Sequence, residues 1–126
     1  MFAINGDKSI YLTRGDMAIL SVTAKKSATE NYTFNVGDIV RFKVFEKKNC
    51  ENVVMQKDTR VSTEGTEVEI QLTKEDTTIG ELISKPVDYW YEVELNPDTA
   101  PQTIVGYDED GAKVFRLYPE GGNMNA

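Results

Sequence analysis

The sequence contains no histidine and a single cysteine in 126 residues. Without histidine, the most common general base is absent, and so are the Ser-His and Cys-His pairs of nucleophilic catalysis. The single cysteine, Cys50, can form neither an internal disulfide nor a zinc or CxxC site, so we expect a free thiol. These absences predict that the protein is not an enzyme and holds neither a metal nor a cofactor.

Long hydrophobic runs and an excess of basic residues are also missing. No apolar stretch approaches the length that spans a bilayer, and residues 1–7 lack the basic and apolar parts of a signal peptide. The 14 Lys and Arg residues are outnumbered by 21 Asp and Glu, so the formal net charge is −7. Nucleic acids and anionic membranes repel such a chain, because phosphate binding needs a basic patch. We therefore expect synthesis in a cytoplasm, with no nucleic-acid partner and no membrane partner.

What the sequence does have is alternation of apolar and polar residues with a period of two, which is typical of half-buried β-strands. The strongest example is residues 87–95, where Tyr91 and Val93 alternate with acidic residues. The predicted strands are residues 9–12, 17–24, 40–44, 53–55, 67–72, 87–95, 102–106 and 113–118. Thr73 followed by Asp76 has the spacing of a helix N-cap, which predicts a short helix near residues 74–82.

Short strands at regular spacing, separated by turns, are typical of a β-sandwich. We predict a mostly β fold, an immunoglobulin-like antiparallel β-sandwich of about seven to eight strands with one short helix. This single domain covers residues 1–118, and a flexible C-terminal tail follows at residues 119–126. The predicted core consists of Leu20, Val22, Val40, Phe42, Val44, Val68, Ile70, Tyr91 and Val93.

Trp90 is the only tryptophan, and alternation places it on the polar side of its strand. A lone aromatic residue among polar groups is typical of an interface anchor, and an equally weighted alternative is that it fills a groove at the edge of the sandwich. Trp90, Glu92 and Glu94 are therefore the candidate interface residues. None of the acidic residues lies in an apolar context that would raise its pKa for glycosidase chemistry.

Two short motifs have ordinary structural interpretations. The integrin-recognition tripeptide Arg14-Gly15-Asp16 lies between two predicted strands, where Gly15 would supply the positive φ of a turn. Residues 108–111, Asp-Glu-Asp-Gly, match part of a calcium-binding loop. The pattern fails at both ends, with Gly106 in the first position and Leu117 in the position of the bidentate carboxylate. Acidic residues beside a Gly between two strands indicate a hairpin tip.

Five segments, spread over most of the chain, carry a family resemblance. They are Ile10-Tyr11-Leu12-Thr13-Arg14-Gly15-Asp16, Val36-Gly37-Asp38 before Val40-Arg41-Phe42-Lys43-Val44, Leu72-Thr73-Lys74-Glu75-Asp76-Thr77, Tyr89-Trp90-Tyr91-Glu92-Val93, and Gly111-Ala112-Lys113-Val114-Phe115-Arg116-Leu117-Tyr118-Pro119-Glu120-Gly121. In this order they resemble the N-terminal β-domain of phage and prophage baseplate upper proteins, which are tail structural proteins of Gram-positive bacteria.

The resemblance implies a virion structural protein that is made in the cytoplasm of the bacterial host. Such a protein forms homo-oligomers, commonly around the tail axis, and binds other tail or baseplate proteins without catalysis. This chain ends soon after the β-domain and has no fibre segment, so we expect a small tail-attached protein. The alternative is a carbohydrate-binding β-sandwich module that stacks sugar rings on Trp90 and on Tyr107 or Tyr118.

Overall fold

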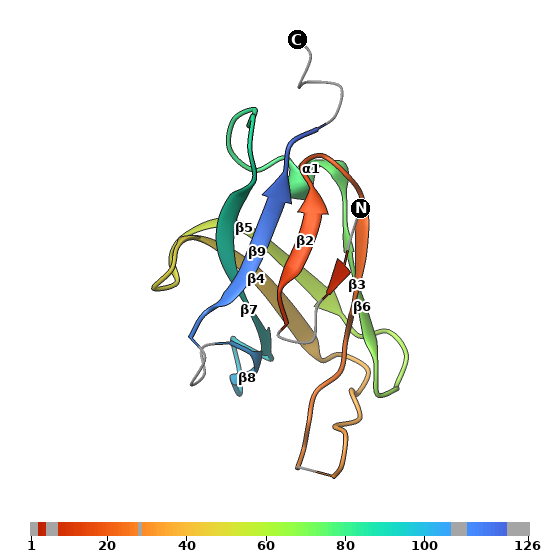
Figure 1. Ribbon diagram of the computed structural model, residues 1–126. Helices are drawn as coiled ribbons and strands as arrows, with labels where there is room; N and C mark the ends of the chain where they lie inside the picture. The colour runs from red at the N-terminus through yellow and green to blue at the C-terminus, as the bar shows by residue number, and fades with distance from the viewer. Residues whose placement is uncertain (1–2, 5–7, 28, 107–110, 121–126) are drawn as a thin grey trace.

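The computed structural model of the protein describes residues 3–4, 8–27, 29–106 and 111–120 (Figure 1). Within these residues the fold is mostly β, with nine strands and one short helix, α1 (Lys74–Thr77). The strands are β1 (Ala3–Ile4), β2 (Ile10–Thr13), β3 (Ala18–Val22), β4 (Ile39–Lys47), β5 (Glu51–Arg60), β6 (Val68–Leu72), β7 (Val87–Leu95), β8 (Gln102–Val105) and β9 (Lys113–Tyr118). The number of strands exceeds the predicted seven to eight because it includes β1, which has only two residues.

The strands form two sheets of unequal size. The larger has seven strands in the order β1-β2-β9-β7-β4-β5, with β8 also paired to β7, and the smaller consists of β3 and β6. Strand β2 pairs with β9 in parallel, with Ile10 opposite Phe115. The prediction of antiparallel strands throughout is therefore wrong at this pair. Strand β9 is antiparallel to β7 on one side, and its other edge receives β2 from about a hundred residues earlier, a long-range contact that alternation does not specify.

Both sheets contribute to one hydrophobic core. The nine predicted core residues are all buried, with exposed fractions of 8% or less, so this prediction is confirmed. Leu20 and Ile70 of the small sheet lie in the same core as Phe42 and Phe115 of the large one. The rings of Phe42 and Phe115 are 5.9 Å apart, which joins β4 to β9 across the core. Buried side chains that the prediction missed include Leu12, Phe34, Phe115 and Leu117.

Helix α1 is shorter than predicted. The cap is as expected: the Thr73 hydroxyl accepts a hydrogen bond from the Asp76 amide, and the Asp76 carboxylate accepts one from the Thr73 amide at 2.9 Å. The helix was predicted to reach residue 82 but ends at Thr77. Ile79 is buried in the core and Gly80 has a φ of +69°, so the chain leaves the helical path within one turn.

The Arg14-Gly15-Asp16 segment forms a turn, as predicted. Gly15 has a φ of +86°, and the Asp16 amide donates to the Thr13 carbonyl at 3.1 Å. Arg14 is only 7% exposed, and its guanidinium donates to the carbonyl oxygens of Ile79 and Gly80 at 2.9 and 2.6 Å. Arg14 therefore connects the turn after β2 to the loop after α1. The hairpin tip predicted at residues 108–111 falls largely on residues 107–110, which lie outside the described residues.

Candidate functional site

The outward side of β7 carries the predicted interface residues. Trp90, Glu92 and Glu94 are each half-buried, whereas Tyr91, Val93 and Leu95 point into the core. This alternation is the one predicted for residues 87–95. Because β7 lies between β9 and β4 in the sheet, these three side chains lie over the middle of the outer face, not at its edge.

Trp90 belongs to a row of apolar side chains that crosses four strands. Phe45 of β4 and Val114 of β9 lie directly opposite Trp90, and Val53 of β5 lies opposite Phe45. Directly opposed residues share one face of a sheet, so these four side chains, here called the apolar row, are neighbours. Phe45 is 5% exposed and Val53 is 52% exposed, so the row becomes more accessible toward β5.

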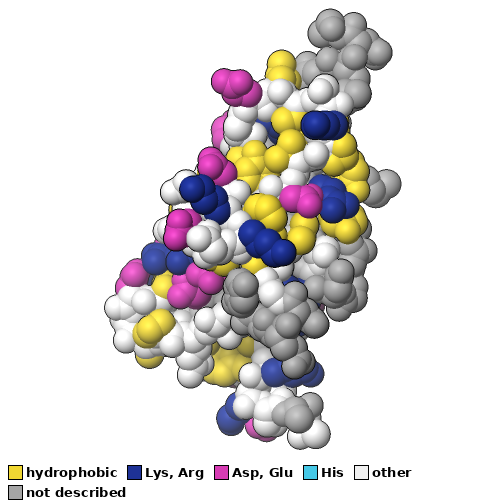
Figure 2. Space-filling model, turned by 60° about the vertical axis from the view of Figure 1, so that its left-hand side comes forward, with side chains coloured by type: hydrophobic (Ala, Val, Ile, Leu, Met, Phe, Trp, Pro, Cys, Tyr) yellow, Lys and Arg dark blue, Asp and Glu magenta, His cyan; other side chains and the backbone are white. Residues whose placement is uncertain are grey.

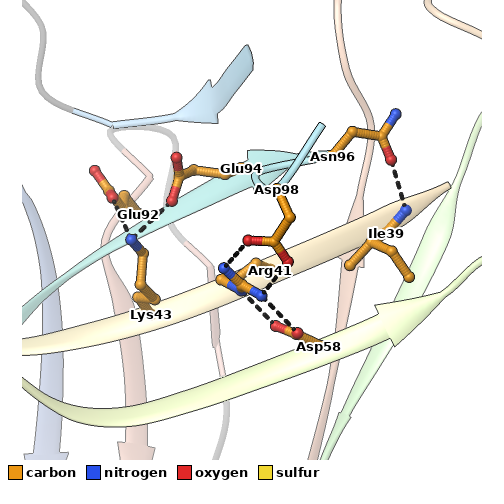
Figure 3. Close-up of polar contacts among 8 residues, drawn as sticks. All are labelled: Ile39, Arg41, Lys43, Asp58, Glu92, Glu94, Asn96 and Asp98. Carbon is orange, nitrogen blue, oxygen red and sulfur yellow. Dashed lines mark hydrogen bonds and ion pairs between the residues drawn. The ribbon is translucent and has the colours of Figure 1, made fainter. Parts of the chain in front are cut away.

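Lys43 holds the two predicted glutamates together. Its Nζ lies 2.8 Å from Oε1 of Glu94 and 3.3 Å from Oε1 of Glu92 (Figure 3). The nearby carboxylate of Glu94 raises the pKa of the lysine against the opposing effect of burial. The same ammonium group lies 5.8 Å from the centre of the Phe45 ring. Lys43 thus connects the carboxylates to the apolar row.

Arg41 forms the next polar group along β4. Its Nε and Nη2 donate to the two carboxylate oxygens of Asp58 at 2.8 and 2.9 Å, and Asp98 accepts at 3.1 and 3.3 Å (Figure 3). Hydrogen bonding to Arg41 lowers the pKa of Asp58 below its usual value of 3.8. Two parallel hydrogen bonds fix the plane of the guanidinium group, so β4 and β5 are tied together beside Lys43.

On the other side of Trp90, Arg116 of β9 pairs with Asp88 of β7. The Nε of Arg116 lies 2.6 Å from Oδ1 of Asp88, and the guanidinium group lies 4.9 Å from the centre of the Tyr11 ring. Tyr11 in turn meets Tyr118 edge to face, with ring centres 6.1 Å apart. The aromatic part of the outer face therefore continues from the apolar row onto β2 and the end of β9.

Each acidic residue around Trp90 has an ion-pair partner within the sheet. Asp88 pairs with Arg116, while Glu92 and Glu94 pair with Lys43. Figure 2 shows hydrophobic surface interrupted by cationic and anionic side chains that lie close to one another. The sequence showed the acids on this side of the strand but not their partners, because cross-strand register cannot be read from alternation. Phe45, Val53 and Val114 were missed for the same reason.

Cys50 lies in the turn between β4 and β5, with a φ of +61°. Burial, with a further contribution from the charge of Glu92, raises the pKa of its thiol. A thiol with a raised pKa is mostly protonated at neutral pH and is therefore a weak nucleophile. The geometry gives this cysteine no activated thiolate.

The described part of the chain contains no group of three or more His, Cys, Asp or Glu side chains that could hold a metal ion. No helix in that part is long and apolar enough to cross a bilayer. Comparisons with protein-family models, with curated proteins and with solved structures found no match to this chain. The outer face of the large sheet is therefore interpreted from its own geometry.

Proposed function

We propose that the chain is a structural component of a phage or prophage tail and that it binds a neighbouring tail or baseplate protein through the outer face of its seven-stranded sheet. The observation that carries the proposal is the position of Trp90, half-buried between two ion-paired groups in the middle of that face. Aromatic residues at the centre of a contact surface, surrounded by polar groups that exclude water, are typical of binding hot spots.

The ion pairs make this face suited to docking at low cost. Lys43 and Glu94 are only 21% and 19% exposed, so a partner that covers them removes little further water from their charged groups. Their side chains are also held in one arrangement before binding, which reduces the entropy lost on association. A partner therefore meets an ordered, ion-paired surface, on which Arg116 balances Asp88 while Lys43 leaves one negative charge on Glu92 and Glu94.

The assignment to a tail rests on the five resembling segments, four of which contribute directly to this face. The segment at residues 10–16 supplies Tyr11, and the segment that ends at Val44 supplies Arg41 and Lys43. Tyr89-Trp90-Tyr91-Glu92-Val93 supplies Trp90, and the segment around Arg116 supplies the partner of Asp88. The proposal includes no catalysis, a location in the virion and assembly with other tail proteins. It also treats the two packed sheets as an immunoglobulin-like sandwich, supported by the single core that both sheets share.

The test is immunoelectron microscopy of particles released from a bacterium that carries the gene, with an antibody against the purified chain. We expect label on the tail or baseplate of wild-type particles, and loss of that label in a Trp90→Ala strain whose protein accumulates normally. A Thr99→Ala strain, with a small exposed change outside this face, should retain the label. The proposal would be overturned if wild-type particles carry no label and if particles also assemble normally after deletion of the gene.

The second candidate function is carbohydrate binding, and the aromatic side chains of the outer face favour it. Tyr11, Tyr118 and Trp90 all lie on this side of β2, β9 and β7 and are half-buried, so parts of their rings are open to solvent. Such rings can stack on sugars while neighbouring carboxylates bond hydroxyl groups. A glycan array distinguishes the two functions: binding that is lost in Trp90→Ala supports this candidate, and a blank array removes it. Tyr107, the other residue considered for stacking, lies outside the described residues.

A further inference from the structure

Strand β3 has an edge without a partner strand in the described part of the chain. On one side it pairs with β6, from Ala18 opposite Leu72 to Val22 opposite Val68, and the small sheet contains no third strand. Figure 1 shows β3 and β6 together at the right-hand side of the view. The main-chain amides and carbonyls on the free side of β3 are arranged to pair with an additional strand.

This edge also lacks the charges that usually prevent strands from pairing between molecules. The stretch from Met17 to Ala24 contains no Lys, Arg, Asp, Glu or Pro, although 28% of the chain is charged. Two other edge strands carry charges: β5 contains Glu51, Lys57 and Arg60, and β6 contains Glu69. Charged residues and prolines on an edge strand discourage intermolecular pairing, and β3 has none of them.

The outward side of β3 is apolar at its N-terminal end, before the exposed Ser21. Met17 is 78% exposed and Ile19 is 49% exposed, although both are large hydrophobic residues. Together with Leu72 and Gln71 of β6 they border a shallow groove of about 480 Å³. Adjacent exposed apolar side chains beside an open strand edge are typical of surfaces that become covered on association.

We propose that β3 pairs in an antiparallel manner with β3 of a second copy of this chain, about a twofold axis, to form a continuous sheet in the order β6, β3, β3 and β6. The occupant is a second copy for an electrostatic reason. Two chains that each carry −7 repel one another, and the repulsion is lowest where the contact surface carries no charge. A partner selected by its opposite charge would need charged residues on this strand, and β3 has none.

The burial pattern of β3 also fits self-pairing. Ala18, Leu20 and Val22 are buried and Ile19 is exposed, so the strand alternates strictly. In an antiparallel register that opposes even-numbered residues to even-numbered ones, the buried side of each copy continues the buried side of the other. With the twofold axis beside residue 19, Ile19 lies opposite Ile19 of the second copy and Met17 lies opposite Ser21, which is the self-complementary contact of a twofold dimer. The outer face of the large sheet takes no part in this contact, so the inference stands whether or not that face binds a tail protein.

The experiment measures the mass of the full chain by light scattering over a wide range of protein concentration, for the wild type and for two variants. Ile19→Lys places a charge on the β3 edge that faces its own counterpart across the twofold axis. The control is Val36→Lys before β4, an exposed apolar side chain (67%) that belongs neither to β3 nor to the apolar row. Circular dichroism and thermal unfolding establish that each variant is folded.

We expect the wild type and Val36→Lys to reach twice the chain mass of 14.2 kDa, and the dissociation constant of Ile19→Lys to rise at least about tenfold. Raising the salt concentration should preserve or strengthen the dimer, because salt screens the repulsion between two anionic chains. Any of four results would overturn the inference. They are a wild type that stays monomeric, a wild type that forms a trimer, a dimer that Ile19→Lys leaves intact, and a dimer that salt dissociates. Loss of tail labelling in Trp90→Ala is a separate result and leaves the dimer unaffected.

Discussion

Arg14 and Glu120 form an ion pair across 106 positions of sequence, with Nη1 of the arginine 3.0 Å from Oε1 of the glutamate. The pair lies where the turn after β2 meets the chain just beyond β9. The arginine side chain is 8% exposed and the glutamate 32%, so the contact is mostly shielded from water. Residue 120 belongs to the stretch predicted as a flexible tail, yet its side chain closes over Arg14.

Replacing Arg14 should strongly destabilise the fold. Arg14→Met keeps the aliphatic bulk but leaves the Ile79 and Gly80 carbonyls and Glu120 without their donor. We expect the free energy of unfolding to fall by about 2–4 kcal/mol, because buried polar groups lose their hydrogen bonds. Urea unfolding measures the change, with Arg60→Met at an exposed position as the control. Equal stability of the two variants would show that the Arg14 hydrogen bonds contribute nothing.

Gly15 should tolerate alanine less well than another glycine of similar conformation. Gly15 has a φ of +86°, and a Cβ there would lie 2.9 Å from Oε1 of Glu120, whereas at Gly37, with a φ of +97°, the nearest atom is 3.8 Å away. Both variants incur the backbone cost of about 1–2 kcal/mol. We expect Gly15→Ala to lower the temperature of thermal unfolding more than Gly37→Ala does, because Glu120 must also move. If Gly37→Ala is equally or more destabilised, the close approach has no effect.

Lys43 should be more important than an ordinary surface lysine. Its replacement by Met leaves Glu92 and Glu94 close together without a cation, so we expect a loss of about 1–3 kcal/mol in the free energy of unfolding. A double variant with Glu94→Gln should recover part of that loss, because one of the two like charges is removed. The exposed Lys48→Met is the control. Additive effects of the two substitutions would argue against coupling between these residues.

Acid should destabilise the protein partly through Asp58. The pKa of this carboxyl is lowered in the folded protein by Arg41 from its usual value of 3.8. The unfolded chain therefore takes up the proton first as the pH falls. The stabilisation that ionised Asp58 gives to the fold is fully present above the unfolded pKa and is lost as the pH falls through the lower folded pKa. Urea unfolding at a series of pH values should show a shallower acid dependence for Asp58→Asn. Some dependence should remain, because Asp38 and Asp76 also have lowered pKa values. An unchanged profile would show that Asp58 takes no part.

Trp90→Ala should leave a folded protein. The indole is half-buried beside Phe45 and Val114, so its truncation should cost about 1–2 kcal/mol, less than the 3–5 kcal/mol of a fully buried aromatic residue. Phe42→Ala, in the core, is the comparison. Thermal unfolding of both variants decides between the two interpretations of Trp90. A loss as large as that of Phe42→Ala would make Trp90 a structural residue and not an anchor.

Alternation was sufficient to predict the β content and nine of the buried core residues. The bounds of β7 and β9 and the burial of Tyr91 and Val93 all follow from a period of two, because one face of each strand has to be apolar. The cap at Thr73 also follows from local chemistry. These predictions depend only on residues that are close together in the chain.

The remaining features depend on which strands become neighbours. Lys43 neutralises Glu92 because β4 lies beside β7, and Phe45 joins Trp90 for the same reason. The parallel pairing of β2 with β9 and the ion pair of Arg14 with Glu120 join the two ends of the chain. Sequence periodicity contains no information on strand order or register, so the ion-paired surroundings of Trp90 appeared only in the folded structure.

The parallel pairing of β2 with β9 has a consequence for synthesis on the ribosome. Strand β2 is made about a hundred residues before the strand that covers its inner edge, Lys113–Tyr118. The large sheet therefore cannot be completed until β9 has emerged, and until then β2 keeps one side open, apart from its short pairing with β1. A ribosome that stalls before residue 113 would release a chain with this edge exposed, and such truncated chains should be preferred substrates for chaperones and proteases.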